Sequence, residues 1–264
     1  MVRAGLIIVL ITVLAAVAGP FLSPYDSTAQ ELAHRLEAPT FAHPLGLDEL
    51  GRDILARLLE GARISLMVGL AVVSVSSTVG MLFGSIAGYF GGRIDDLISR
   101  VIDVLMAFPG ILLAIALVAV LGPSLTNVVL ALSVIGWVGY ARLVRGQALR
   151  AREFEFVQAA RACGASSARI VLRHILPTAL SAVVVQATLG MAGAIIAEAS
   201  LSFLGLGVQP PTPSWGTMLD AGRAHLFDAP HLTVFPGLAI ALLVLGFNFL
   251  GDGLRDRVDP KMVR

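Results

Sequence analysis

Long uncharged stretches, separated by short polar ones, set the pattern of this sequence. The first runs from Ala4 to Leu22 behind Arg3, the second from Ile64 to Gly92, and the third from Val104 to Ala141. A helix needs about 20 apolar residues to cross a bilayer, so the third stretch is long enough for two helices. The pattern predicts six membrane spans, at about residues 4–22, 64–90, 98–121, 125–147, 175–198 and 232–251.

Two of these spans carry residues that bear on their structure. Pro109 lies inside the third span, where it removes a backbone hydrogen bond and predicts a kink. The first span has a second interpretation as a signal peptide, because Ala16-Val17-Ala18 resembles a cleavage site. We favour a retained helix, since more membrane-spanning sequence follows it rather than a soluble exported domain.

The polar segment 26–63 has helical periodicity in its second half. The acid-before-base pairs Asp48–Arg52 and Asp53–Arg57 support a helix there. Two interpretations stay open: an amphipathic helix lying on the membrane surface, or a simple extension of the second span.

A second polar segment, 200–231, is rich in glycine and proline. Its stretch Gln209-Pro210-Pro211-Thr212-Pro213 prevents a continuous helix. Because unpaired backbone is not tolerated in lipid, the segment predicts a partly re-entrant loop packed against protein.

Small and polar residues mark one face on each of two spans. On the second span, a stripe at four-residue steps predicts close helix packing: Ser76, Gly80, Gly84 and Gly88. On the fifth span, Gln186, Gly190 and Glu198 share a face. Polar groups are unfavourable in lipid, so this face should meet protein or water. It either bonds to neighbouring helices or lines a translocation path.

The composition agrees with a polytopic membrane protein. Of 264 residues, 56% are hydrophobic and only 14% are charged, against about 25% in soluble domains. The net charge of +1 provides no basic field for nucleic acid. The only lysine, Lys261, lies between Pro260 and Met262, so the chain has no phosphate-binding Walker loop. The single Cys163 excludes an internal disulfide.

The distribution of arginine and lysine predicts the orientation. The side with both termini holds 14 of the 19 basic residues, namely Arg3, Arg93, Arg100, Arg142, Arg145, Arg150, Arg152, Arg161, Arg169, Arg173, Arg255, Arg257, Lys261 and Arg264. The other side holds Arg35, Arg52, Arg57, Arg63 and Arg223. Both termini and the segment 151–177 should therefore face the cytoplasm, and the segments 26–63 and 200–231 the outside.

The segment 151–177 is the longest arginine-rich island in the chain. Residues 153–163 have a helical pattern that Gly164 ends in the manner of a C-terminal glycine. Ser166 or Ser167 can cap a second helix ahead of Pro177. The sequence predicts a helix, a glycine turn and a helix, which suits mechanical contact with a soluble partner.

This island resembles the EAA loop of permease subunits of ATP-binding-cassette importers. The residues from Gln158 to Gly164 read Gln-Ala-Ala-Arg-Ala-Cys-Gly, and Ile175-Leu176-Pro177 follow. Gln158 stands where that family has its glutamate. A salt bridge to an ATPase would become a neutral hydrogen bond at this position.

The resemblance extends over nearly the whole chain. The stretches from His43 to Leu66, Phe108 to Ser124, Ala197 to Leu219 and Phe235 to Pro260 are similar to C-type permeases of dipeptide, oligopeptide and nickel importers. The resemblance implies an all-α integral membrane protein of the bacterial inner membrane, with the six-helix type I importer permease fold.

The same resemblance implies partners and roles. The partners are a homologous B-type permease, two ABC ATPase subunits or one fused ATPase, an extracytoplasmic solute-binding protein and the lipid bilayer, with no nucleic acid. ATP and Mg would bind to the ATPases, and no cofactor to this chain, which is not an enzyme. The ATPase-coupling residues would be Phe154, Phe156, Gln158, Ala159, Ala160 and Gly164.

Short peptides are the expected substrate, with a nickel or glutathione permease of the same group as the alternative. A metal path would favour clustered ligands, but the five histidines have no ligand spacing on a helix. An ion-coupled secondary transporter is the distant alternative, and the span centres lack the ionisable residues that it would use. A membrane scaffold without transport is the third class.

Overall fold

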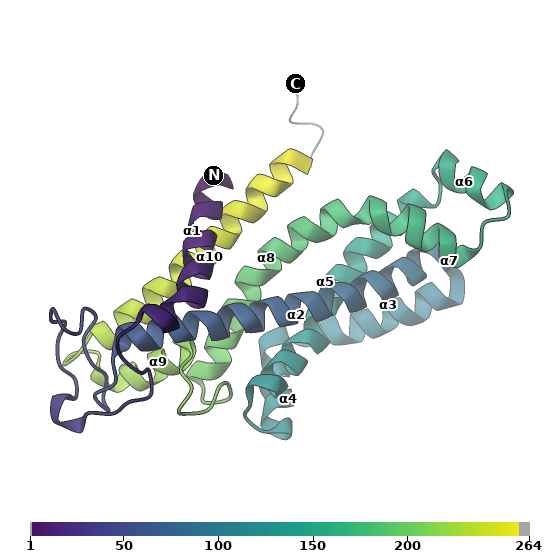
Figure 1. Cartoon of the computed structure of the whole chain (residues 1–264). Coiled ribbons are helices and arrows are strands. Elements are labelled where there is room, and N and C mark those ends of the chain that lie inside the picture. Colours follow the sequence, from purple (N-terminus) through teal and green to yellow (C-terminus); the bar gives the residue numbers. More distant parts are fainter. Residues whose placement is uncertain (1, 259–264) are drawn as a thin grey trace.

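The computed structural model of the chain describes residues 2–258, apart from the side chains of Pro20, Leu22 and Val258, and it is almost entirely helical. Pro260, Lys261 and Arg264 lie outside the described residues. The membrane-length helices are α1 (Val2–Leu22), α2 (Ile54–Phe90), α5 (Leu125–Ala151), α8 (Leu176–Phe203) and α10 (His231–Val258). Helices α2, α5 and α8 run along the molecule, and α1 packs against α10 at one side (Figure 1).

The third predicted span is two helices rather than one kinked helix. Helix α3 (Gly92–Met106) and helix α4 (Gly110–Leu121) meet at an angle of 85°. Pro109 is the N-cap of α4 and so lies outside both helices. Proline disfavours the α conformation in the residue before it, so the helix ends there instead of bending. Counting the bent pair as one span, the described residues contain six.

The second span begins earlier than the predicted residue 64. Asp53 caps α2 by accepting a hydrogen bond from Ala56 N at 2.7 Å, and the helix runs unbroken from Ile54. The separate surface helix is therefore wrong, and the extension of the span is correct. The expected Asp53–Arg57 ion pair is also wrong in the described structure, because the Asp53 carboxylate lies 2.9 Å from His43 Nδ1 instead.

The fifth span also extends further than predicted. Helix α7 (Ser167–Ile170) passes through a π-helical turn, Val171–Ile175, directly into α8. Pro177 lies at the start of α8, where its missing N–H falls next to the wider turn. The second helix of the island is thus the end of a span, and the turn at Gly164 separates it from α6.

The segment 200–231 contains a helix that the sequence analysis missed. Helix α9 (Trp215–Gly222) begins at Ser214, whose side chain and that of Thr217 form a reciprocal capping box. A single helical turn, Arg223–His225, follows it. Trp215 is 2% exposed, and its Nε1 donates to the backbone oxygen of Leu58 at 2.9 Å. This contact fixes the segment to the start of α2.

The predicted small-residue stripe lies where α2 packs against α5. A Cβ atom on Gly84 would lie 2.5 Å from the Ala141 oxygen, and one on Gly88 would lie 2.6 Å from the Ala148 Cβ. Gly80 faces Tyr140, and Ser76 is buried beside Gly136. The two backbones approach so closely that only hydrogen or a very small side chain fits between them.

Candidate functional site

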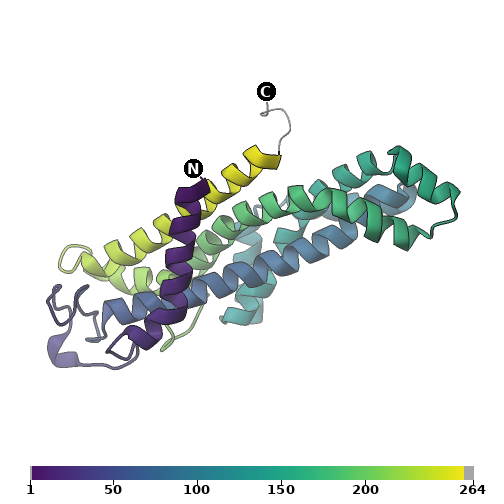
Figure 2. The ribbon, with the colours of Figure 1, turned by 45° about the horizontal axis from the view of Figure 1, so that its top comes forward.

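The predicted island forms a projection at one end of the bundle. Helix α6 (Glu155–Ala162) lies between α5 and α7 at the end opposite the segment 23–53 and α9 (Figures 1 and 2). Gly164 turns the chain with a φ of 79°, which an L side chain rarely adopts. Ala165 N then bonds to Ala160 O at 3.0 Å, and Ser166 caps the next helix. The predicted turn is therefore present.

Helix α6 is fixed to the bundle by a small core of its own. Val157, Ile170 and Ile175 are fully or almost fully buried and pack with Tyr89 and Ala148. This core joins α6 to the ends of α2 and α5. Packed side chains, and not only the connecting backbone, therefore attach α6 to the spans.

The opposite face of α6 is open. Phe154 and Phe156 are 41% and 48% exposed, and their ring centroids lie 5.5 Å apart. Ala159 and Gly164 are also exposed, with no atom within 4 Å of a Cβ built on Gly164. Two exposed aromatic rings beside small residues form a surface typical of a protein contact.

The remaining two predicted coupling residues contact the rest of the chain. Ala160 is half-buried against the small core. Gln158 Nε2 donates to the Arg152 oxygen at 3.2 Å, which ties α6 to the end of α5. The six residues thus lie together on one short segment, and all of them except the half-buried Ala160 are exposed.

A cavity of about 280 Å³ lies between α2, α4, α5 and α8. Its lining is mainly apolar, with Ser76, Tyr140 and Gln186 as polar members and Gly190 on the same wall. The Tyr140 hydroxyl donates to the Gln186 backbone oxygen at 3.5 Å, and Ser76 Oγ has no hydrogen-bond partner within residues 2–258. A cavity of this kind accepts uncharged groups that form a few hydrogen bonds.

Glu198 shares the helix face of Gln186 and Gly190 but lies outside this cavity. It is fully buried, and its carboxyl group accepts hydrogen bonds from Ser202 at 2.7 Å and from Ser65 at 3.2 Å. Ser65 belongs to α2, so the contact joins two spans. The geometry favours helix bonding for Glu198 and cavity lining for Gln186 and Gly190.

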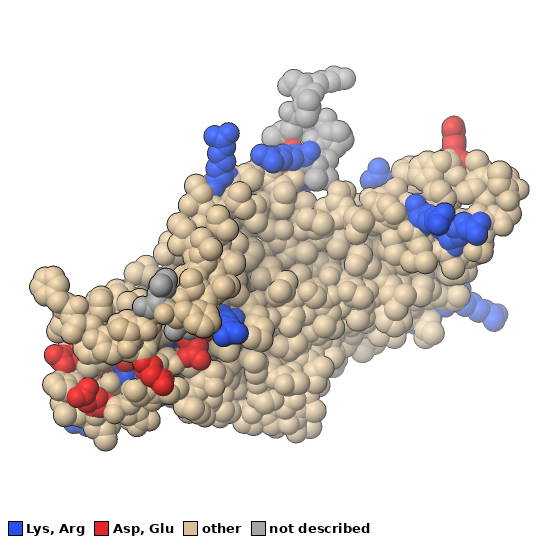
Figure 3. Space-filling view, in the orientation of Figure 1, with Lys and Arg blue, Asp and Glu red and all other residues tan. Residues whose placement is uncertain are grey.

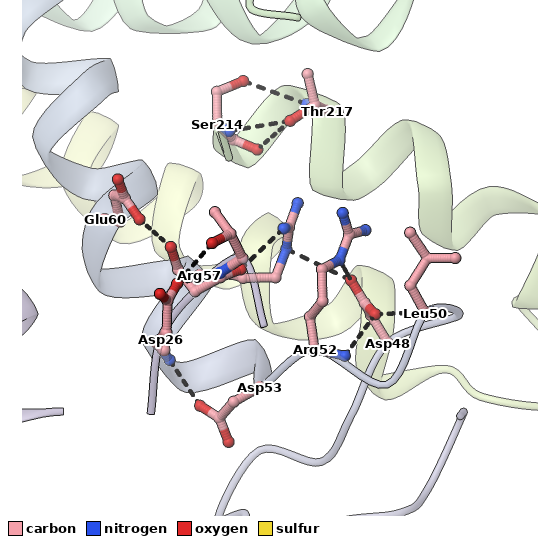
Figure 4. A network of polar contacts seen from close by, with 12 residues as sticks. Asp26, Asp48, Leu50, Arg52, Asp53, Arg57, Glu60, Ser214 and Thr217 are labelled. Atoms are coloured by element: carbon pink, nitrogen blue, oxygen red, sulfur yellow. Dashed lines mark hydrogen bonds and ion pairs between the residues drawn. The ribbon is translucent and has the colours of Figure 1, made fainter. Parts of the chain in front are cut away.

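The end opposite α6 contains a buried ionic network that sequence spacing revealed only in part (Figure 4). Asp48 accepts from Arg52 Nε at 2.6 Å and lies 3.5 Å from Arg57 Nε. Arg57 also donates to the Ser27 oxygen at 3.2 Å, and Ser27 bonds to Glu60. The spacing predicted the Asp48–Arg52 pair, although the pair forms in a loop. Nothing in the sequence indicated the contacts to Ser27.

Charge is divided between the two ends of the molecule. In Figure 3, basic side chains gather near α6 and at the described ends of α1 and α10, and acidic side chains gather mainly at the other end. This division agrees with the grouping of arginines that the sequence analysis used for orientation.

Comparisons with known proteins match nearly the whole chain. Residues 80–264 match the family described as binding-protein-dependent transport system inner membrane component, and residues 1–39 match the N-terminal TM domain of oligopeptide transport permease C. The dipeptide transport system permease protein DppC of Alkalihalophilus pseudofirmus is 48% identical, over 98% of this chain and 85% of its own length. The glutathione transport system permease protein GsiD of Pectobacterium atrosepticum is 48% identical, over 99% and 87%.

Solved structures support the fold. A chain of the MetNI methionine ABC transporter, in an inward facing conformation, matches with a TM-score of 0.61 and 20% identity, over 76% of this chain and 96% of that chain. A chain of an amino acid ABC transporter matches with a TM-score of 0.57 and 16% identity. At these identities the likeness shows the fold alone. The predicted fold class, an all-α importer permease, is confirmed.

Proposed function

Because this chain belongs to the family of binding-protein-dependent transport system inner membrane components, we propose that it forms half of a translocation path for short peptides. The family places it among the multi-pass membrane components of ABC importers. The observation that carries the peptide substrate is the 48% identity to a dipeptide permease over 98% of the chain. The uncharged cavity beside Gln186 and Gly190 supports this proposal, because short peptides differ in side-chain charge but share backbone groups.

The second candidate substrate is glutathione. A glutathione permease is as similar to this chain as the dipeptide permease is, at 48% identity. Both assignments use the same path, so the choice between them falls to the solute-binding protein that delivers the substrate.

The proposed orientation places both termini and α6 in the cytoplasm. The segment 23–53 and α9 then face outward, where a loaded binding protein docks. A homologous B-type permease completes the path across the membrane. Two ATPase subunits, or one fused ATPase, bind ATP and Mg on the cytoplasmic side, and this chain hydrolyses nothing.

Helix α6 is the proposed contact with the ATPase. Its exposed face offers Phe154 and Phe156 as anchors for a partner pocket, with Ala159 and Gly164 allowing close approach. Its buried face connects through Val157 to the ends of the spans. Closure of the ATPases would thus move α6 and the helices together.

The test is uptake into vesicles that contain the complete transporter, with labelled dipeptide and labelled glutathione supplied on their cognate binding proteins. We expect ATP-dependent uptake of the dipeptide. Replacing Gly164 with valine should leave the complex assembled but uncouple ATP hydrolysis from uptake, because φ of 79° is strained for valine. Normal uptake by Gly164→Val would contradict the coupling role. Uptake of glutathione alone would select the second substrate.

A further inference from the structure

A polar pocket of about 480 Å³ opens beside α6 and has no role in the proposed path. Its walls come from four helices: Tyr89 and Phe90 at the end of α2, Arg152 and Glu153 after α5, Gln158 and Arg161 on α6, and Ser167 on α7. It therefore lies where the projecting segment joins the bundle.

The pocket holds one cation that its own residues leave uncompensated. Arg152 Nε donates to the Glu153 carboxylate at 2.9 Å, and this pair cancels its own charge. Arg161 forms no ion pair or side-chain hydrogen bond with any residue from 2 to 258. Gln158, three residues before Arg161, is neutral, and Glu155, the acidic residue of α6, forms no ion pair with Arg161 in the described structure.

Arg161 is held in place although it is unpaired. Its guanidinium carbon lies 5.6 Å from the centroid of the Tyr89 ring, and the buried Tyr89 belongs to the small core beneath α6. A guanidinium on an aromatic face keeps its N–H edge free for a planar, two-point contact. The side chain is exposed to solvent, so a ligand can reach that edge.

We propose that this pocket receives a carboxylate side chain of the partner ATPase, which Arg161 binds by a charge-assisted contact. The proposal rests on the proposed function, because it assumes that α6 docks on an ATPase. A carboxylate fits better than a phosphate, since Glu153 already lines the pocket and repels a more highly charged anion. The pocket also adjoins the exposed α6 surface with Phe154 and Phe156, so one partner covers both. Arginine is enriched among the residues that dominate such interfaces.

Gln158 is part of this arrangement. Its amide bonds to the Arg152 oxygen and brings no charge into the pocket. A glutamate at the same position would compensate Arg161 from within the chain. The neutral side chain thus leaves the cation available to the partner.

The test measures binding of the purified ATPase to the permease pair in nanodiscs, together with ATP-dependent uptake. Arg161→Glu should weaken ATPase binding by about tenfold or more. The matched control, Arg169→Glu, makes the same charge change on α7 outside the pocket and should weaken it less. Arg161→Gln should also make binding less sensitive to added salt. Equal effects of the two reversals would overturn the proposal.

Two further variants change the net charge of the pocket and leave Arg161 in place. Gln158→Glu should weaken ATPase binding, and Glu153→Gln, which frees Arg152, should strengthen it. If Arg161 had a purely structural role, neither substitution would change ATPase binding. In a charge-swap experiment, each Asp or Glu at the ATPase surface is changed to arginine in turn. One of these changes should restore binding of the ATPase to the Arg161→Glu permease. If none restores binding, the ligand of Arg161 is not a carboxylate.

Two further binding measurements test whether the pocket binds a phosphate group instead of a carboxylate. Inorganic phosphate, or nanodiscs that contain phosphatidylglycerol, should leave the difference between wild type and Arg161→Gln unchanged. A difference that depends on either one would replace the ATPase carboxylate with a phosphate ligand. If Arg161→Glu binds normally while Gly164→Val still uncouples uptake, this inference fails and the proposed function stands.

Discussion

The two ends of this molecule differ in the burial and ion pairing of particular arginine side chains. At the end with segment 23–53, Arg52 and Arg57 are only 6% and 5% exposed and share the carboxylate of Asp48. At the α6 end, Arg161 is exposed and lacks a carboxylate partner within the described chain, and the rings of Phe154 and Phe156 near the start of α6 are exposed.

This difference indicates that the buried charges at the first end stabilise the fold and that the exposed groups at the second end are available to contact another protein. A buried ionic group is destabilising unless its partners are in place, so the first end depends on its own contacts. Exposed groups contribute little to folding, so the second end is free to meet another protein. Substitutions of the buried ionic residues at the first end should lower the free energy of unfolding, and substitutions of the exposed residues at the second end should lower transport alone.

The largest effect on stability should come from Asp48→Ala. It leaves Arg52 and Arg57 close together in a buried site without their shared anion, and we expect a loss of about 3–5 kcal/mol. Thermal unfolding of the purified complex would show it. As a control, Asp103→Ala breaks the exposed Arg142–Asp103 pair and should change stability by less than about 1 kcal/mol. Similar losses for both would contradict the comparison.

Gly84→Val should have the next largest effect. Its Cβ would lie 2.5 Å from the Ala141 oxygen, so α2 and α5 must separate, and the expected loss is about 2 kcal/mol. The yield of folded complex and its unfolding temperature report it. Gly139→Ala on α5, which has nothing within 4 Å of its Cβ, should be neutral. A tolerated valine at position 84 would show that the two helices need not approach so closely.

Trp215→Phe should have a smaller effect. It removes the hydrogen bond to the Leu58 oxygen and leaves that buried acceptor unpaired, for a loss of about 1 kcal/mol. Trp137→Phe is the control, since that ring packs against Phe83 with centroids 5.4 Å apart. Proteolysis of the loop before α9 would detect the loosening, and equal protection in both variants would argue against it.

Phe154→Ala with Phe156→Ala should have the smallest effect on stability and a large one on transport. Both rings are exposed, so the unfolding temperature should hardly change. ATP-dependent uptake should fall by about tenfold or more if the rings anchor a partner. Leu172→Ala, which removes an exposed apolar side chain from the π turn next to α7, is the control. If the double variant lost stability but kept ATP-dependent uptake, the two rings would serve folding and not contact with a partner.

The sequence predicted the features that depend on neighbouring residues. Length and absence of charge predicted the spans, and the four-residue spacing from Ser76 to Gly88 predicted a packing face. The position of Gly164 predicted the turn after α6. The exact span ends were less accurate, because helix continues through charged residues, such as Arg57 before residue 64 and Arg169 before residue 175, where no cap or turn stops it.

The tertiary structure alone decided which distant side chains meet. Glu198 bonds to Ser65 across 133 residues, and Trp215 bonds to Leu58 across 157. Arg161 lies over Tyr89 rather than beside a carboxylate. Periodicity shows which face of a helix is buried, but it contains no information on the rotation and depth at which two helices pack. Those two quantities determined that Glu198 joins helices, that Gln186 faces a cavity, and that Arg161 lies over an aromatic ring without a carboxylate partner among residues 2–258.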